Sequence, residues 1–231
     1  MNLAIINNRR TNSFAFIILK RTLDIILSVL ALVSLSPFLL LVCLLVKISS
    51  PGPIIYKQKR CGLNNKIFFI YKFRTMPSGI EKDSGPVWGD EADCRSTKLG
   101  LYLRISHIDE LPQLINVLRG EMSLVGPRPE RPYFANQFKK DIPDYELRHM
   151  VKPGITGWAQ INGYRGNTSI AKRTEYDLYY IHNWSLLFDL KIIFNTPASN
   201  DLKTLFSRHH SSNPLFNLSS GVFYLKENSR S

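Results

Sequence analysis

The longest uncharged stretch of the chain, residues 25–46, constrains its fold more than any other feature. It reads IILSVLALVSLSPFLLLVCLLV, and at ~1.5 Å per residue a helix of this length reaches roughly 33 Å, the thickness of the hydrocarbon core of a bilayer. The stretch is too long for the apolar part of a signal peptide, and no small-residue cleavage site follows it. We therefore predict a membrane-embedded helix that stays in the mature chain.

Basic residues flank this stretch on both sides, which is awkward for a straight crossing. Lys20 and Arg21 precede it and Lys47 follows it, whereas the positive-inside rule gathers such residues on one side of a membrane. A hairpin that enters and leaves by the same leaflet removes the conflict, and there each Lys or Arg contributes roughly 1 kcal/mol with anionic lipid. A single span kinked by proline is the alternative, and at this stage it stays open.

Ser36 and Pro37 form the predicted membrane hinge. They divide the stretch into halves of ~11 residues, or roughly 16 Å each, about half of the hydrocarbon thickness. Proline interrupts the helical hydrogen bonds and bends the helix, and the hydroxyls of Ser34 and Ser36 are placed to bond carbonyls freed at the break. The prediction is a re-entrant helix, break and helix.

The net charge of +12 indicates the kind of partner. Up to Ile80, eleven Lys and Arg residues stand against Asp24 alone. Such an excess favours polyanions: nucleic acid, anionic lipid or phosphorylated substrates. Because 44% of the residues are hydrophobic, the chain can bury a core, which excludes wholesale disorder. Three cysteines without a CxxC pair argue against a disulfide framework or a zinc site and suit the reducing cytoplasmic side.

The remainder of the chain predicts an α+β region that is mainly helical. SSPGP ends the membrane helix, and IIYKQKR and KIFFIYKFRTM predict two strands joined by the turn CGLNN. Basic and aromatic side chains alternate along them, a pattern that could stack bases, but without a known motif we expect a hairpin at the membrane interface and no nucleic-acid partner. A long polar loop follows, PSGIEKDSGPVWGDEAD. Helical periodicity is present in residues 99–104, 110–119, 135–138 and 174–194.

The predicted organisation has four parts. They are a basic N-terminal segment (residues 1–19), the re-entrant membrane helix (20–48), a cytoplasmic region with a small β-hairpin (49–196), and a divergent, loosely structured tail (197–231).

Two adjacent carboxylates, Asp109 and Glu110, are the first candidates for chemistry. Proline is tolerated only in the first turn of a helix, so Pro112 fixes the start of the helix that follows them. Asp109 is then the predicted N-cap, with Glu110 in the first turn, where the helix dipole favours anions. The plain interpretation is a capping pair.

The neighbours of this pair favour a functional interpretation. Arg104 precedes it, and Arg128 follows on a turn made rigid by Pro127 and Pro129, an arrangement that suits forked recognition of phosphate. A phosphate beside carboxylates requires a cation between them, and Mg²⁺ takes oxygens from one or two carboxylates, water and substrate phosphates.

Six motifs in order resemble those of bacterial sugar transferases, the monotopic polyprenyl-phosphate phosphoglycosyl transferases, from about residue 20 to residue 196. They read KRTLDIILS with its later Ser36-Pro37 break, SPGPIIYKQKRCG, IYKFRTM, LRISHIDELPQLINVLRGEMSLVGPRPE, VKPGITGWAQINGYRG and YDLYYIHNWSLLFDLKII. The chain is similar to the minimal catalytic form of the family, which has no further N-terminal spans.

The resemblance implies a role for each candidate residue. Asp109 is the implied nucleophile and Glu110 the implied Mg²⁺ ligand, with Asp189 as a further acidic position at the metal. The implied substrate-binding residues are Lys72, Arg104, Pro127, Arg128, Pro129 and Arg165. Structural alternatives are that Lys72 snorkels beside the membrane, Arg104 pairs with Asp93, and Asp189 caps a helix. Tyr164 stands where some relatives carry the arginine, so Arg165 reaches the site differently, and His107 is expected to be a surface residue.

The resemblance also implies a reaction. A hexose 1-phosphate, glucose or galactose, passes from a UDP-sugar to undecaprenyl phosphate through a phospho-Asp109 intermediate, at the cytoplasmic face of the bacterial inner membrane. This reaction begins exopolysaccharide, capsule or O-antigen synthesis. An N-acetylated or diamino sugar, and an inactive membrane scaffold, are the alternatives. Anionic lipid is an expected partner, and a homodimer is kept open.

Overall fold

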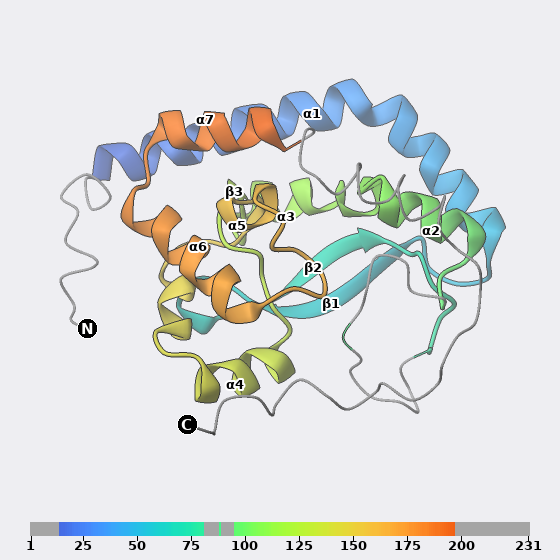
Figure 1. Cartoon of the computed structure of the whole chain (residues 1–231). Helices are drawn as coiled ribbons and strands as arrows, with labels where there is room; N and C mark the ends of the chain where they lie inside the picture. The colour runs from blue at the N-terminus through green and yellow to red at the C-terminus, as the bar shows by residue number, and fades with distance from the viewer. Residues whose placement is uncertain (1–13, 81–87, 89–94, 197–231) are drawn as a thin grey trace.

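The computed structural model describes residues 14–80, 88 and 95–196 (Figure 1). Within these residues helices predominate, and the strands form two two-stranded sheets. This agrees with the predicted, mainly helical α+β class. The basic N-terminal segment lies largely outside the described residues, and so do the tail and most of the predicted polar loop.

Helix α1 (Phe14–Ser49) is the predicted membrane helix, and it contains Pro37. The predicted start at residue 20 is wrong, because residues 14–19 are apolar, lack a helix breaker and extend the helix. The Ser36 hydroxyl donates to the carbonyl of Val33 at 2.8 Å. Val33 lies four residues before Pro37, so the hydroxyl bonds the carbonyl that the proline nitrogen cannot. This confirms the predicted use of Ser36, and Figure 1 shows α1 changing direction in its later half.

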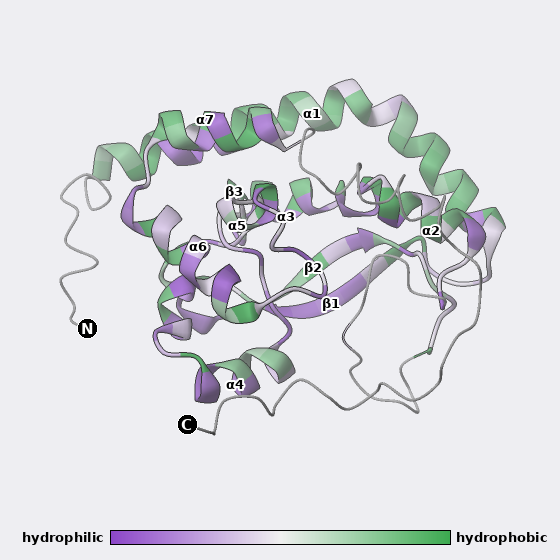
Figure 2. Ribbon diagram, in the orientation of Figure 1, coloured by the Kyte–Doolittle hydropathy of each residue, from purple (hydrophilic) through white to green (hydrophobic). Residues whose placement is uncertain are grey.

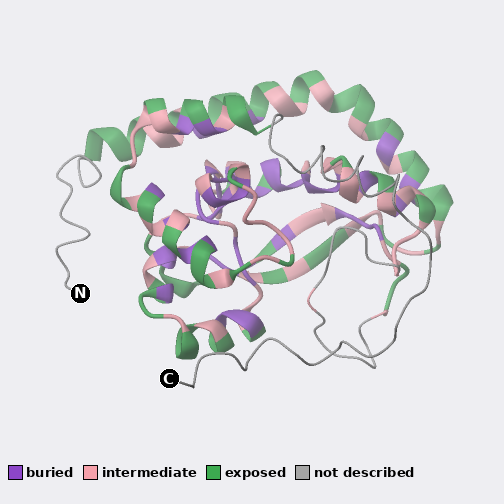
Figure 3. Ribbon diagram, viewed as in Figure 1, coloured by how far each residue is buried: buried purple, intermediate pink, exposed green. Residues whose placement is uncertain are grey.

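The polarity of α1 is inverted relative to a helix of a soluble core. Its buried residues are Asp24, Ser28, Val42 and Val46, two of them polar. Most of its apolar side chains are exposed, as Figures 2 and 3 show. The helix is long and apolar enough to cross a membrane. An exposed apolar surface of this length requires a nonpolar environment, which indicates a membrane protein.

The polar side chains near the start of α1 fasten it to the rest of the fold. Arg21 donates to the carbonyls of Val117 at 2.5 Å and Leu118 at 2.8 Å, in the last turn of α3 (Gln113–Arg119). Asp24 Oδ1 accepts from the backbone N–H of Leu124 at 3.1 Å. Carbonyl groups at a helix C-terminus attract cations. The bonds to α3 therefore account for the position of the Arg21 side chain without the predicted contact with anionic lipid.

The other end of α1 is held by Arg74. Its Nη2 donates to the carbonyls of Val46 at 3.2 Å and Ser50 at 2.5 Å, and its Nη1 donates to Pro53 O at 2.6 Å. Arg74 follows strand β2 (Ile67–Phe73) directly. Both ends of the helix are thus bound by one folded region.

The predicted hairpin is confirmed. Strands β1 (Ile55–Cys61) and β2 (Ile67–Phe73) pair antiparallel, with Ile55 opposite Phe73. The turn between them is a short 3₁₀ segment, η2 (Leu63–Asn65). Asn64 and Asn65 have φ of 51° and 60°, a left-handed conformation that asparagine tolerates.

Three of the four predicted helices are confirmed, and the fourth is divided. The confirmed ones are α2 (Lys98–Ile105), α3 and α4 (Pro132–Asp141). A continuous helix over residues 174–194 is wrong: α6 (Ile170–His182) and α7 (Leu186–Asn195) are separate. The side chain of Ser185 caps α7 by accepting from Phe188 N–H, so local hydrogen bonding starts a new helix. Shorter segments are η3 (Ile108–Glu110), η4 (Tyr145–Met150) and α5 (Trp158–Ile161).

A parallel pair of short strands was not predicted. Strand β3 (Ser123–Val125) pairs with β4 (Gly154–Thr156), joining the motifs SLVGPRPE and VKPGITG. The backbones approach so closely that a Cβ on Gly154 would lie 2.1 Å from the Gly126 nitrogen. Both glycines are therefore required by packing, because any side chain would separate the strands.

A buried histidine makes the stability of this fold sensitive to acid. His149 lies in η4, and among the described residues neither of its ring nitrogens has a hydrogen-bond partner. Burial, with a further contribution from Arg148, lowers its pKa from 6.5 to about 4. The unfolded state therefore binds the proton more tightly. The contribution of neutral His149 to the free energy of unfolding is fully present above pH ~6.5. It decreases as the pH falls toward 4, and at pH 5 about 2 kcal/mol of it has been lost.

We predict that His149→Phe removes this component. Denaturant unfolding of the detergent-solubilised protein at pH 7 and pH 5 measures it, and the variant is expected to lose about 2 kcal/mol less on acidification than the wild type. Equal losses in the two proteins would contradict the prediction.

Candidate active site

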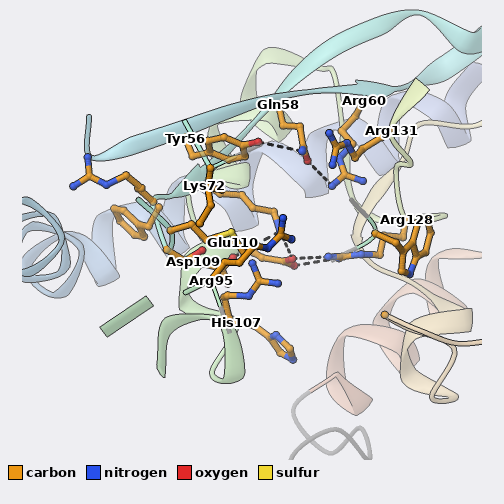
Figure 4. Close-up of a pocket in the computed structure, with 18 of the residues that line it drawn as sticks. Tyr56, Gln58, Arg60, Lys72, Arg95, His107, Asp109, Glu110, Arg128 and Arg131 are labelled. Atoms are coloured by element: carbon orange, nitrogen blue, oxygen red, sulfur yellow. Dashed lines mark hydrogen bonds and ion pairs between the residues drawn. The ribbon is translucent and has the colours of Figure 1, made fainter. Parts of the chain in front are cut away.

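A cavity of about 490 Å³ lies between the β1–β2 hairpin, the α2–η3 turn and the segments that follow β3 and α5 (Figure 4). Its cationic lining residues are Arg60, Lys72, Arg74, Arg95, Arg104, Arg128, Arg131, Arg165 and Arg173. Its acidic ones are Asp109, Glu110 and Glu130. Such an excess of cations in a concave site attracts a polyanionic ligand.

The turn before η3 directs the acidic pair into the cavity. Helix α2 ends at Ile105, and His107 adopts a left-handed conformation with φ of 57°. Its N–H donates to the Arg104 carbonyl at 3.1 Å, which closes the helix end. The expectation of a surface histidine is wrong, because His107 is half-buried and lines the cavity. Burial, followed by Arg165, lowers its pKa to about 4, so the ring is neutral at pH 7.

The predicted N-cap role of Asp109 is wrong. Asp109 lies inside the 3₁₀ segment, and α3 begins later, at Gln113 after Pro112. A cap is worth about 1 kcal/mol, which several buried charge contacts to other segments can exceed. The two carboxylates accordingly face the cavity and its cations.

Glu110 is the centre of the cationic cluster. Lys72 Nζ lies 2.7 Å from its Oε1. Arg128 donates to both oxygens, from Nη2 to Oε1 at 2.6 Å and from Nη1 to Oε2 at 3.2 Å. Arg165 Nη2 lies 3.1 Å from Oε2. Burial raises the pKa of Glu110, but Arg128, Lys72 and Arg165 together outweigh it and hold the pKa well below the ordinary value. Glu110 is therefore a stable anion.

Asp109 is held more loosely than Glu110. Lys72 Nζ lies 3.7 Å from its Oδ2. Burial raises the pKa of Asp109, Lys72 lowers it, and the adjacent Glu110 raises it again, for a net upward shift. A carboxylate that is desolvated and only weakly paired is more basic and more nucleophilic than its neighbour.

Arg128 lies on a turn in which the carbonyl groups of residues 127, 128 and 129 all accept hydrogen bonds. Gly154 N–H donates to Pro127 O at 2.9 Å. Arg148 Nη2 donates to Arg128 O at 3.0 Å, and Arg60 Nη1 to Pro129 O at 3.0 Å. The two prolines fix φ and carry no N–H. These hydrogen bonds favour the predicted rigid turn.

Behind this turn lies a buried ion-pair network that the sequence did not reveal. Arg148 Nη2 pairs with Asp177 at 2.6 Å, and Arg173 Nη1 pairs with Glu130 at 2.6 Å. All four residues are buried. Arg148 and Asp177 are 29 positions apart, so no local spacing could have paired them.

The structure brings most of the predicted substrate-binding residues to one place. Lys72, Arg128 and Arg165 meet at Glu110, and Arg104 lines the same cavity. The extra Tyr164 does not keep Arg165 away, because its ring packs on Tyr176 with centroids 4.7 Å apart. The alternative partner of Arg104, Asp93, lies outside the described residues.

Asp189 is not at this cavity. Its carboxylate accepts from Lys20 Nζ at 2.5 Å, Tyr180 OH at 2.7 Å and Trp184 Nε1 at 3.1 Å. It lies in the first turn of α7, next to α1. The prediction that it shares a metal with Glu110 is therefore contradicted. Its motif and acidity suggested the metal site, whereas its hydrogen bonds connect α7 to the membrane helix.

Comparison with known proteins decides the family. The model of the family described as "Bacterial sugar transferase" matches residues 15–200. The chain belongs to the bacterial sugar transferase family. This confirms the resemblance predicted from the six motifs.

Three relatives illustrate what the chain is similar to. The "UDP-glucose:undecaprenyl-phosphate glucose-1-phosphate transferase" of Escherichia coli (strain K12) is 50% identical over 78% of the chain and 39% of its own length. The "UDP-N-acetylgalactosamine-undecaprenyl-phosphate N-acetylgalactosaminephosphotransferase" of Aeromonas hydrophila is 45% identical over 79% and 43%. The "Exopolysaccharide production protein PSS" of Rhizobium leguminosarum bv. phaseoli is 44% identical over 79% and 95%. The chain thus spans about two fifths of the first two relatives.

The acidic pair Asp109 and Glu110 suits a hard divalent cation. Among the described residues no group of three His, Cys, Asp or Glu side chains could hold a metal. Asp109 and Glu110 line the cavity next to each other. Mg²⁺ binds through one or two carboxylates and takes its other oxygens from water and substrate phosphates. The donor set therefore fits Mg²⁺, with Glu110 and Asp109 as the residues that would hold it.

The position of Asp189 leads to a stability prediction. We expect Asp189→Asn to lower the free energy of unfolding by about 1–3 kcal/mol, because the amide presents N–H groups to donors that need an acceptor. Thermal unfolding in detergent measures it, with Asp141→Asn, an exposed change of the same type, as the matched control. If both variants unfold with the wild type, the Lys20–Asp189 contact does not stabilise the α1–α7 packing.

Proposed function

We propose that this chain transfers a sugar 1-phosphate from a UDP-sugar to undecaprenyl phosphate through a covalent phospho-Asp109 intermediate. The observation that carries the proposal is the weakly paired, desolvated carboxylate of Asp109 beside three cations in one cavity. The names of the relatives support the reaction class, since they include UDP-sugars and undecaprenyl phosphate.

In the first step, an Asp109 carboxylate oxygen attacks the phosphorus that bears the sugar. A P–O bond to this phosphorus forms as the bond to the bridging diphosphate oxygen breaks, and UMP leaves with the electron pair. Lys72, Arg128 and Arg165 bind the phosphate oxygens and stabilise the charge that develops there. Loss of one such donor typically costs about 3 kcal/mol of barrier. Bound Mg²⁺ supplies further positive charge at the phosphates.

In the second step, an oxygen of undecaprenyl phosphate attacks the same phosphorus. The bond to Asp109 breaks, the carboxylate is regenerated, and undecaprenyl-diphospho-sugar leaves. The anomeric C–O bond is untouched in both steps, so the sugar keeps its configuration. Two displacements by groups of modest reactivity replace one difficult transfer between two bulky substrates.

The attachment of α1 supports the re-entrant arrangement. Arg21 and Asp24 fasten its early part, and Arg74 binds its C-terminal end, to the same folded region. A straight crossing would carry one end to the opposite side of the bilayer, beyond reach of these partners. We propose that the helix enters and leaves the cytoplasmic leaflet of the bacterial inner membrane, with the catalytic region in the cytoplasm.

Helix α7 extends the proposed membrane surface. Leu187, Leu190 and Phe194 recur at helical spacing and are exposed by 79%, 39% and 78%. The helix lies beside α1 in Figure 1, joined to it by the Lys20–Asp189 contact. An apolar face next to a membrane helix favours a place at the lipid interface. The cavity is then held close to the lipid phosphate it is proposed to use.

A panel of donors tests the reaction and names the sugar. Purified protein in lipid nanodiscs with undecaprenyl phosphate and Mg²⁺ is given UDP-glucose, UDP-galactose, UDP-N-acetylglucosamine and UDP-N-acetylgalactosamine, and UMP release is followed. We expect the highest kcat/KM with a UDP-hexose, UDP-glucose first. A preference for an N-acetylated donor would reassign the sugar. No UMP from these or a diamino sugar donor would favour the inactive scaffold.

A single substitution tests the nucleophile. We expect Asp109→Asn to reduce UMP release by at least ~10³-fold, because the neutral amide cannot attack phosphorus. Asp141→Asn, which changes an exposed aspartate of α4, is the control and retains wild-type turnover. Substantial turnover by the Asp109 variant would require another nucleophile.

A further inference from the structure

The three cations assigned above to the substrate diphosphate are already occupied in this structure. Lys72 comes from β2, Arg128 from the turn after β3, and Arg165 from the segment after α5. They meet at Glu110, with N–O distances of 2.7, 2.6 and 3.1 Å. Glu110 thus takes the place that an anionic ligand would take.

We propose that Glu110 is a displaceable counter-ion, whose carboxylate competes with the substrate diphosphate for Lys72, Arg128 and Arg165. The inference rests on the proposed function, because it takes a nucleotide diphosphate as the ligand of the cavity. It adds to that function a resting state in which the phosphate-binding cations are ordered and neutralised by a residue of the protein.

The geometry of Arg128 makes the competition direct. Both of its terminal nitrogens donate to Glu110, at 2.6 and 3.2 Å. A guanidinium that uses both nitrogens on one carboxylate cannot present the same forked pair to a phosphate. Binding of a diphosphate through this fork therefore requires the bond to Glu110 to break.

The exchange has a favourable direction once a ligand is present. Three cations around one carboxylate leave an excess of positive charge, whereas the diphosphate of a nucleotide sugar carries two negative charges. Without any anion the three cations would repel one another in a buried site. Glu110 accordingly holds the three cations together until the ligand binds. The diphosphate then replaces part of the electrostatic attraction between Glu110 and these cations.

Release of Glu110 has a consequence for the divalent cation. In the resting state its oxygens accept from cationic donors, so a metal ion must compete with them. When a diphosphate binds these donors, the carboxylate becomes available as an oxygen ligand. Diphosphate and divalent cation therefore assist each other's binding, and the assistance is reciprocal by thermodynamic linkage.

The test separates this role from that of a metal ligand by working without metal. The probe is methylenediphosphonate, whose P–C–P bridge cannot be cleaved, titrated calorimetrically in excess EDTA into wild type, Glu110→Gln and Glu175→Gln. We expect Glu110→Gln to bind the probe at least tenfold more tightly than wild type. The matched control, Glu175→Gln, removes an exposed carboxylate of α6 that pairs with Lys172 and is not among the residues that line the cavity, and is expected to change the affinity less than threefold.

Unchanged or weaker binding by Glu110→Gln overturns the proposal, and so does an equal gain in the control or no binding by any protein. Thermal unfolding shows whether each variant is folded. Should the glutamine variant not fold, Glu110→Asp, which keeps the charge but withdraws the carboxylate by one methylene, is expected to bind more tightly than wild type in EDTA. UMP release by wild type is measured separately, so this inference can fail while the proposed reaction stands.

Discussion

The contact of Glu110 with Lys72, Arg128 and Arg165 is the interaction around which the cavity is arranged. Cations from three separate segments converge there, and they would repel one another without a buried anion. The left-handed turn at His107 directs the carboxylate inward, and the bonded carbonyls of residues 127–129 present Arg128 to it. Phosphate chemistry is then proposed at Asp109, the neighbouring carboxylate that stays weakly paired.

The membrane helix is joined to this cavity through strand β3. Asp24 accepts from Leu124 N–H, and Lys20 donates to the carbonyl of Val125 at 3.2 Å. The next residues are Gly126 and Pro127, which lead into the turn that carries Arg128. The polar face of α1 therefore fixes the position of the cavity relative to the membrane helix, as the proposed reaction with a lipid phosphate requires.

The sequence predicted those features that depend on local chemistry. The β1–β2 hairpin follows from turn residues, and the Ser36 hydrogen bond beside Pro37 follows from the missing proline N–H. The motifs also indicated Asp109, Glu110 and the cations near them. Features set by contacts between distant segments were missed or wrong. Asp189 has an acidic motif position but lies against α1, and the parallel pair of β3 and β4 joins two segments without strand periodicity.

Asp109 is proposed to take the sugar phosphate before the lipid does. The most direct measurement is intact-mass spectrometry of the wild-type protein mixed with its UDP-sugar and Mg²⁺, with undecaprenyl phosphate withheld, followed by peptide mapping. We expect a mass increase of one sugar phosphate, located on Asp109 and lost when the lipid is added. A protein that releases UMP upon addition of lipid but never carries the adduct would contradict it.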